Sequence, residues 1–189
     1  NCRLEICDVL SYASSMTQIK CIDLSQNNCN STFNKTLFST LRFSPSFDTL
    51  IIDDVSFKSN CIIPFFSFIF SRFEHGLRLS VASLITTDEI WTQLFDFLST
   101  TTFRSLVSLV WDKNRLNPKL FAFLLKNPFF ENLSLNSCFS SSSSDLIRQL
   151  GMFVQSSNAL RSLSIRGNDE NYLGSSLNSL LKMIFVSKS

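Results

Sequence analysis

Few residues in the sequence are suited to acid–base or nucleophilic chemistry. His75, in the segment FEHGLR, is the single histidine, and neither a G-x-S-x-G nor an H-E-x-x-H pattern accompanies it. The adjacent carboxylates Asp53 and Asp54 are a candidate acid–base pair, but neighbouring residues of a strand point to opposite faces of a sheet. We therefore expect a turn or rim histidine, a solvated carboxylate pair and no catalytic residues.

Metal and nucleotide sites require their own spacing patterns, which the sequence lacks. The six cysteines form no C-x-x-C pair, so a zinc site is not predicted. The four glycines build neither a G-x-G-x-x-G sequence nor a phosphate-binding loop. These residues are Cys2, Cys7, Cys21, Cys29, Cys61 and Cys138, with Gly76, Gly151, Gly167 and Gly174. We expect no bound metal and no small-molecule cofactor.

Composition describes a folded chain without a strong charge preference. Of its 189 residues 44% are hydrophobic, enough to fill a core, and the net charge is +2 with the 17 basic residues scattered along the chain. We therefore expect neither a nucleic-acid partner nor a membrane surface. The most apolar run, residues 61–70, contains Pro64 and falls short of the roughly 20 residues that cross a bilayer as a helix.

A recurring apolar frame is the most informative feature of the sequence. The stretch ALRSLSIRGND, residues 159–169, spaces Leu160, Leu163, Ile165 and Asn168 as L-x-x-L-x-L-x-x-N. Five further segments share this frame in whole or in part: IKCIDLSQN (Ile19, Ile22, Leu24, Asn27), FDTLIIDDV (Phe47, Leu50, Ile52, Val55), EHGLRLSVA (Glu74, Leu77, Leu79, Ala82), LVSLVWDKN (Leu106, Leu109, Trp111, Asn114) and FENLSLNSC (Phe130, Leu133, Leu135, Cys138). The second apolar position falls at residues 22, 50, 77, 109, 133 and 163, so the intervals are 28, 27, 32, 24 and 30 residues, about 28 on average. A period of this length indicates a repeat protein.

Between these segments the apolar spacing changes to that of helices. One helical face is predicted in each of the third, fifth and sixth units, by Ile90, Leu94, Phe97 and Leu98, by Leu146, Leu150, Phe153 and Val154, and by Leu177, Leu180, Leu181 and Ile184. Expected helix starts are Asn117-Pro118, Thr87 or Asp88, and Ser143 or Ser144. The first helix is expected over residues 36–42, and residues 61–70 are expected to form the second unit's helix, opened by Pro64. Each unit is thus predicted to be a short strand followed by a helix.

This frame resembles the leucine-rich repeats of the ribonuclease-inhibitor type over essentially the whole chain. The irregular unit lengths are also similar to those of CARMIL-type actin regulators, tropomodulins and Ran GTPase-activating proteins. The resemblance implies an α/β solenoid of about six repeats, with parallel strands on the concave face and helices on the convex face. Because strands stack about 4.8 Å apart and helices about 8–10 Å apart, the array is expected to bend into a horseshoe arc. We expect residues 1–189 to form one array, a fragment of a longer solenoid, in which residues 1–15 end a preceding repeat and residues 16–189 supply six.

The repeat frame also assigns roles to polar residues. Asn27, Asn114 and Asn168, with Cys138 at the same site, are expected to satisfy backbone groups of the neighbouring turn. The strand residues that flank the apolar sites point outward. They give one expected column of Asp23, Ile51, Arg78, Val110, Ser134 and Ser164, and a second of Ser25, Asp53, Ser80, Asp112, Asn136 and Arg166.

The expected function is a non-enzymatic scaffold that binds a protein partner on the concave sheet, with actin or cytoskeletal regulation as one such role. The predicted contact residues are Asp23, Ile51, Asp53, Arg78, Val110, Asp112, Asn136 and Arg166. Two alternatives remain open. A GTPase activator or other enzyme regulator would use a rim arginine such as Arg115 or Arg166, and an extracellular receptor array would use the N-x-S/T sequons at Asn30, Asn34 and Asn132. Cysteines without a disulfide framework favour the cytoplasm.

Overall fold

The computed structural model describes residues 19–41, 48–73, 76–139, 144–167 and 176–186. Six parallel strands form one sheet whose spatial order follows the chain, β1-β3-β5-β6-β7-β8, and two short strands, β2 and β4, pair beside it. The strands are β1 (Cys21–Asp23), β2 (Asn28–Cys29), β3 (Thr49–Ile51), β4 (Ser56–Phe57), β5 (Leu77–Ser80), β6 (Leu106–Val110), β7 (Asn132–Ser134) and β8 (Ser162–Ser164). The helices are α2 (Ser31–Leu41), α3 (Ile62–Arg72), α4 (Asp88–Thr100), α5 (Pro118–Leu125), α6 (Ser144–Ser156) and α7 (Ser176–Val186).

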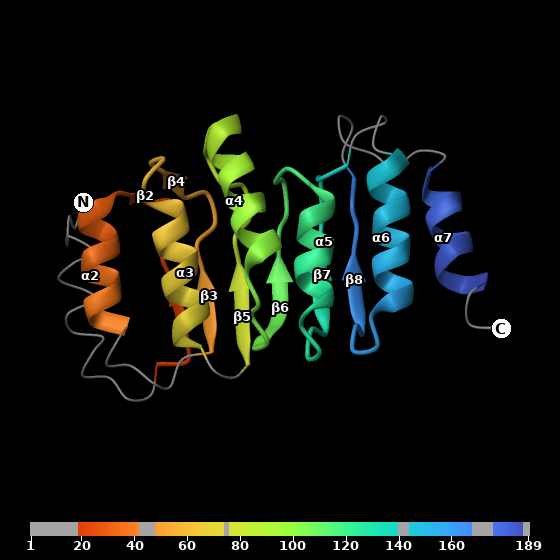
Figure 1. The fold of residues 1–189 in the computed structure, drawn as a ribbon, viewed down its shortest axis with the longest axis horizontal. Helices are drawn as coiled ribbons and strands as arrows, with labels where there is room; N and C mark the ends of the chain where they lie inside the picture. Colours follow the sequence, from red (N-terminus) through yellow and green to blue (C-terminus); the bar gives the residue numbers. More distant parts are fainter. Residues whose placement is uncertain (1–18, 42–47, 74–75, 140–143, 168–175, 187–189) are drawn as a thin grey trace.

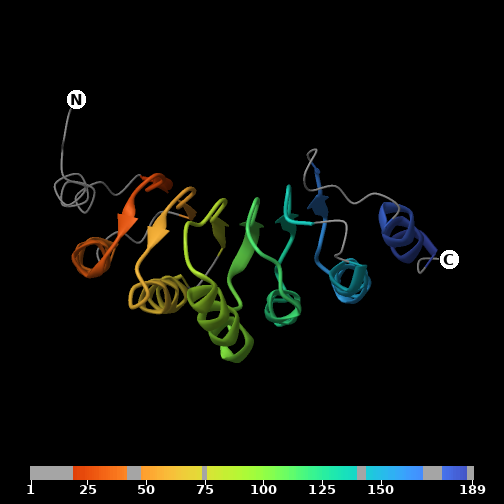
Figure 2. The same cartoon turned by 90° about the horizontal axis from the view of Figure 1, so that it is seen from above.

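The chain is an α/β protein of two layers. Each strand of the large sheet is followed by a helix, and all these helices lie on the same side of the sheet (Figure 1). Seen from above, the helices form an outer arc and the strands an inner one (Figure 2). The wider spacing of packed helices compared with paired strands accounts for this bend. The described helices therefore leave the inner face of the sheet open.

Strand pairing corrects the predicted frame in the third unit. Leu79, and not Leu77, lies opposite Leu50 on one side and Leu109 on the other. The aligned positions are therefore 22, 50, 79, 109, 133 and 163, so the unit intervals are 28, 29, 30, 24 and 30 residues. Leu77, Leu79 and Val81 are all buried, and a register shift between Leu77 and Arg78 accommodates the extra strand length.

A left-handed turn residue recurs four positions after each aligned site of the first five units. The residues are Gln26, Asp54, Ser83, Lys113 and Ser137, with φ values of 55–60°. The backbone N–H of Gln26 donates to the Asp53 carbonyl at 2.8 Å, and each of the other four donates to the equivalent carbonyl of the next unit. The same conformation and hydrogen bond in five units support the corrected register independently of strand pairing.

The core lies between the sheet and the helices. The predicted core helix is present as α3, which begins at Ile62, two residues before the predicted start at Pro64; its Phe65, Phe66 and Ile69 are buried. No helix within the described ranges is long and apolar enough to span a bilayer.

Two predicted helix starts are confirmed by their caps. The Thr87 hydroxyl accepts from the Ile90 N–H at 3.5 Å at the start of α4, and Asn117 Oδ1 accepts from the Lys119 N–H at 3.0 Å with Pro118 at the first position of α5. The first described helix begins earlier than predicted. Asn30 Oδ1 accepts from the Phe33 N–H at 2.9 Å and caps α2, which spans residues 31–41 in place of the predicted 36–42.

The predicted helix faces are only partly buried. Ile90, Leu94 and Leu98 are buried in α4, as predicted. Phe97, Leu146 and Val154 pack against the core but keep part of their surface exposed. In α7, Leu180 is buried, whereas Leu177 and Leu181 of the same predicted face are 42% and 39% exposed. A helical period does not distinguish the face of a helix toward the sheet from the adjacent flank.

Candidate functional site

The open face of the sheet carries the residues predicted to contact a partner. With the corrected register, its first column is Asp23, Ile51, Ser80, Val110, Ser134 and Ser164. Arg78 was wrongly assigned to this column. Arg78 aligns with Thr49 and Ser108, two residues before the first column along the strands, and its side chain is exposed. Ala82 and not Ser80 therefore follows Asp53 in the second column.

Side chains of the second column bind the next unit of the sheet. Asp53 Oδ1 accepts from the Ser80 hydroxyl at 2.7 Å and from the Ala82 N–H at 2.8 Å. Both donors belong to the unit that follows Asp53 in the sheet. A single carboxylate oxygen therefore joins two neighbouring units.

The same arrangement recurs in the later units. Asp112 Oδ1 accepts from the Ser134 hydroxyl at 2.6 Å and from the Asn136 N–H at 2.9 Å. Asn136 Oδ1 in turn accepts from the Ser164 hydroxyl at 3.0 Å and from the Arg166 N–H at 2.8 Å. We call Asp53, Asp112 and Asn136 the junction residues. Three of the predicted contact residues thus also hold the sheet together.

The first unit uses a serine at the equivalent place. Ser25 Oγ accepts from the Asp53 N–H at 3.2 Å and donates to Asp23 Oδ1 at 2.6 Å. The Ser25 N–H also donates to Asp23 Oδ1 at 2.9 Å. Both hydrogen bonds from Ser25 lower the pKa of Asp23, and the bond from the hydroxyl has the larger effect. The exposed Asp23 carboxylate therefore stays charged. Sequence reasoning did not detect these junctions. Their signal in the sequence is a serine two residues before each N–H donor of the third, fifth and sixth units: Ser80 before Ala82, Ser134 before Asn136 and Ser164 before Arg166.

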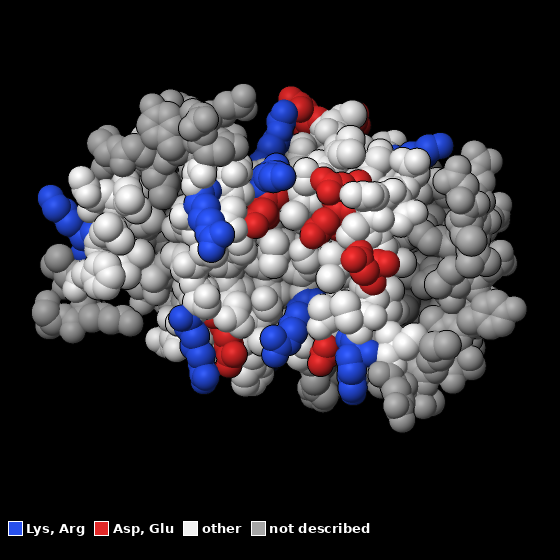
Figure 3. Space-filling model, turned by 180° about the vertical axis from the view of Figure 1, so that it is seen from behind, with Lys and Arg blue, Asp and Glu red and all other residues white. Residues whose placement is uncertain are grey.

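Charge is unevenly distributed on the open face. Viewed from the strand side, carboxylates gather in its upper middle part and basic side chains lie around them (Figure 3). The carboxylates of the two columns and the adjoining turns are Asp23, Asp53, Asp54 and Asp112. Arg166 is exposed in the sixth unit, and the aliphatic side chains of Ile51 and Val110 are half-exposed between the polar ones. The acidic groups thus lie on the first, second and fourth units.

The predicted asparagine sites are structural where they are described. Asn114 is buried, accepts from the Leu84 N–H at 2.8 Å and donates to the Val81 carbonyl at 2.5 Å, both in the preceding unit. Cys138 Sγ donates to the Trp111 carbonyl at 3.2 Å in the same way. Asn27 instead donates within its own turn, to the Leu24 carbonyl at 2.8 Å. Asn168 lies outside the described residues.

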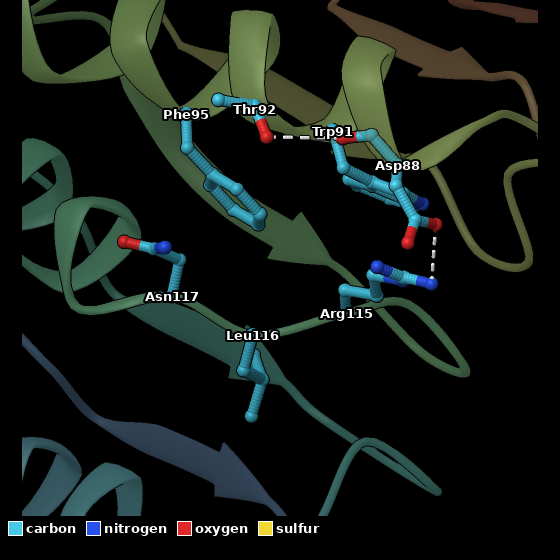
Figure 4. Close-up of a pocket in the computed structure, with 7 residues that line it drawn as sticks. All are labelled: Asp88, Trp91, Thr92, Phe95, Arg115, Leu116 and Asn117. Atoms are coloured by element: carbon cyan, nitrogen blue, oxygen red, sulfur yellow. Dashed lines mark hydrogen bonds and ion pairs between the residues drawn. The ribbon is translucent and has the colours of Figure 1, made fainter.

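A small pocket is lined by residues of α4 and of the loop before α5. It has a volume of about 310 Å³ and lies between the start of α4 and the segment that joins β6 to α5. Trp91 and Phe95 stack at 5.7 Å between ring centroids, and Arg115 Nη2 lies 2.6 Å from Asp88 Oδ1 (Figure 4). Arg115, one of the two predicted rim arginines, is therefore ion-paired within its own chain.

The remaining candidates for chemistry are only partly described. His75, Cys2, Cys7 and Gly174 lie outside the described residues, as do Phe47, Glu74 and the predicted preceding repeat at residues 1–15. Among the described residues, no group of three or more His, Cys, Asp or Glu side chains is placed to hold a metal. Asp54 lies in the left-handed turn, and Asp53 Oδ1 accepts from the Ala82 N–H of the next unit.

The cysteines and sequons also have distinct environments. Burial raises the pKa of the Cys29 thiol, which donates to Asn34 Oδ1 at 2.9 Å, while Asn34 Nδ2 donates to the Cys61 carbonyl at 2.9 Å. Asn34 is buried, so the sequon there is not accessible in the folded chain. Asn30 caps α2, and Asn132 is half-exposed at the start of β7.

No family model matches the sequence, and no curated protein matches it.

Proposed function

We propose that the chain is a leucine-rich repeat solenoid that binds a protein partner on its concave sheet. The aligned strands, the recurrent left-handed turn and the hydrogen-bonded sites of buried Asn114 and half-buried Cys138 support this assignment of repeat type. In such arrays each unit packs only on its neighbours, which leaves one long strand surface available for recognition.

The observation that carries this proposal is the open face of the six-stranded sheet. All described helices lie on the other side (Figure 2). The open face presents Ile51 and Val110 among carboxylates and hydroxyls. Partly exposed aliphatic groups surrounded by polar ones are the composition of a protein-binding surface.

The junction hydrogen bonds support recognition by fixing the polar groups. Asp53 and Asp112 each use Oδ1 to join two units. Their positions are therefore determined before a partner arrives, which reduces the ordering cost of binding. We expect the partner to place basic or hydrogen-bond-donating groups toward Asp23 and Asp53, and acidic groups toward Arg166.

The proposed mechanism is binding without catalysis, in a reducing compartment such as the cytoplasm. Cys29 and Cys138 act as hydrogen-bond donors through their thiols. A disulfide to either sulfur would remove that donor. The thiol form is therefore the one that this packing uses.

The test compares variants of the two faces of the sheet layer. Ile51→Lys and Val110→Lys each place a long cation on the concave face, while Gln93→Lys makes the same change on the exposed surface of α4. Immobilised chains are used to capture partners, and the captured proteins are quantified. The proposal predicts at least a tenfold loss of the specific partner for both concave variants and no loss for Gln93→Lys, with unchanged thermal unfolding. Equal capture by all three variants would overturn it.

A further inference from the structure

The second column of the open face is interrupted at one place. At four of the five junctions between units, a second-column side chain accepts from the N–H of the next unit's second-column residue, beginning with Ser25 and ending with Asn136. At the remaining junction, between the third and fourth units, the accepting position is Ala82, whose methyl group accepts no hydrogen bond. No group in the described part of the chain accepts from the N–H of Asp112, which follows Ala82 in the column.

The neighbouring position of the first column changes at the same junction. In the third, fifth and sixth units a serine hydroxyl donates to the second-column side chain of the preceding unit; these serines are Ser80, Ser134 and Ser164. The fourth unit has Val110 at this position. Acceptor and hydroxyl are therefore both replaced by apolar side chains, and Ala82 and Val110 are half-buried on the open face. We call Ala82, Val110 and the Asp112 N–H the ladder gap.

An unused acceptor lies on the opposite side of the ladder gap from this N–H. Asp53 Oδ1 accepts from both the Ser80 hydroxyl and the Ala82 N–H, and no described donor bonds to Oδ2. Asp53 precedes Ala82 in the column and Asp112 follows it. The ladder gap is thus bordered by a carboxylate oxygen of one unit and a backbone N–H of another, with apolar side chains between them.

Asn136 shows which group fits between such an oxygen and such an N–H. Its Nδ2 donates to Asp112 Oδ2 at 2.8 Å, and its Oδ1 accepts from the Arg166 N–H at 2.8 Å. An amide is neutral and carries both a donor and an acceptor. A carboxylate in the ladder gap would lie beside Asp53 with the same charge and would have no proton to donate. An ammonium or guanidinium group would have no lone pair for the Asp112 N–H.

We propose that the ladder gap binds the side-chain amide of an asparagine or glutamine of the protein partner. This inference rests on the proposed function and specifies the chemistry of one contact. The amide oxygen accepts from the Asp112 N–H, and the amide nitrogen donates to Asp53 Oδ2. The methylene carbons contact Ala82 and Val110. A partner without this amide would cover the N–H and leave it unpaired, so the ladder gap selects among partners.

Filling the ladder gap from within the chain tests the geometry without a partner. Ala82→Asn places an amide at the position that Asn136 has in the fifth unit, and we expect a higher midpoint of urea unfolding than in the wild type. Ala122→Asn is the matched control, because Ala122 is exposed on α5, and we expect no rise in its midpoint. An equal rise in both variants, or no rise in Ala82→Asn, would overturn the inference and leave the proposed binding face untouched.

Peptide selection tests the contact itself. Random 12-residue peptides displayed on phage are selected on the wild-type chain, and the affinities of the selected peptides are measured. We expect them to share an asparagine or glutamine whose replacement by alanine, or by the corresponding acid, weakens binding at least tenfold. Ala82→Asn should weaken binding equally, Ala122→Asn should not, and the bound peptide should slow hydrogen exchange of the Asp112 N–H.

The outcomes separate this inference from the proposed function. Some peptides could be weakened by Ile51→Lys and yet depend on no amide, or bind Ala82→Asn as well as the wild type. That result would overturn the amide contact and support binding on the concave sheet. If Ile51→Lys weakens none of the selected peptides, both proposals are contradicted.

Discussion

Asp112 Oδ1 accepts a 2.9 Å hydrogen bond from the backbone N–H of Asn136, which lies 24 residues later and one strand further along the sheet. The same oxygen accepts from the Ser134 hydroxyl, and Oδ2 accepts from Asn136 Nδ2 at 2.8 Å. A residue of the candidate binding face is therefore also a structural link between two units. Substitutions on this face must be judged for stability as well as for binding.

Replacement of Asp112 by alanine is expected to destabilise the fold. The change removes the acceptor of the Asn136 N–H and of a hydroxyl, and we expect a loss of about 1–3 kcal/mol in the free energy of unfolding. Asp112→Asn keeps an acceptor oxygen and should lose less. Urea unfolding of both variants measures the difference. Equal stability of wild type and Asp112→Ala would show that the junction is not formed.

Asn114 is expected to be more sensitive than the junction residues because it is buried. Asn114→Ala leaves the Leu84 N–H and the Val81 carbonyl without partners, which should cost about 2–4 kcal/mol. Asn158→Ala, at an exposed bend, is the control and should change stability by less than about 0.5 kcal/mol. If the two variants unfold at the same urea concentration, the buried role of Asn114 is wrong.

The corrected register predicts unequal effects for two leucines at equivalent sites. Leu79 is buried between β3 and β6, so Leu79→Ala should cost about 2–5 kcal/mol. Leu163, in the last strand of the sheet, is half-buried and should cost about half as much when replaced by alanine. Chemical unfolding of both variants measures this ratio. A larger loss at Leu163 than at Leu79 would contradict the assigned register.

The sequence predicted the alternation of strands and helices because apolar residues recur with period 2 in strands and 3.6 in helices. It could not choose between Leu77 and Leu79, since both are apolar and alternate residues fit either register equally well. It also could not show that Asp53 and Asp112 bind the next unit, because that requires the alignment of strands 24–29 residues apart. The exposure of Leu177 and Leu181 in α7 was missed for a related reason: period 3.6 marks apolar positions but not whether a neighbouring helix covers them.

Cysteine ionisation is expected to make stability depend on pH in the alkaline range. Burial raises the pKa of Cys138 to about 12, whereas the thiol of an unfolded chain has a pKa of about 8.5. The unfolded chain therefore loses its thiol proton first. The stabilisation from the buried neutral thiol is complete below about 8.5 and is lost as the pH rises toward about 12.

The free energy of unfolding is measured against pH for wild type and for Cys138→Ala. Other groups that titrate above pH 9 affect both chains, so the difference between the two chains reports on Cys138. The stability difference between them is expected to shrink as the pH rises. Alkylation at pH 8 gives a second readout, in which exposed Cys21 should react much faster than Cys138. A pH-independent difference, together with equal alkylation rates, would contradict burial of Cys138.

Photocross-linking from the two faces tests the proposed binding surface most directly. Benzoylphenylalanine is introduced at Val110 on the concave face or at Gln93 on the exposed surface of α4, and each chain is irradiated in extract from the cells that express it. Concave-face binding predicts a covalent adduct with a discrete protein from residue 110 and none from residue 93. Adducts from residue 93 alone, or equal adducts from both sites, would contradict it.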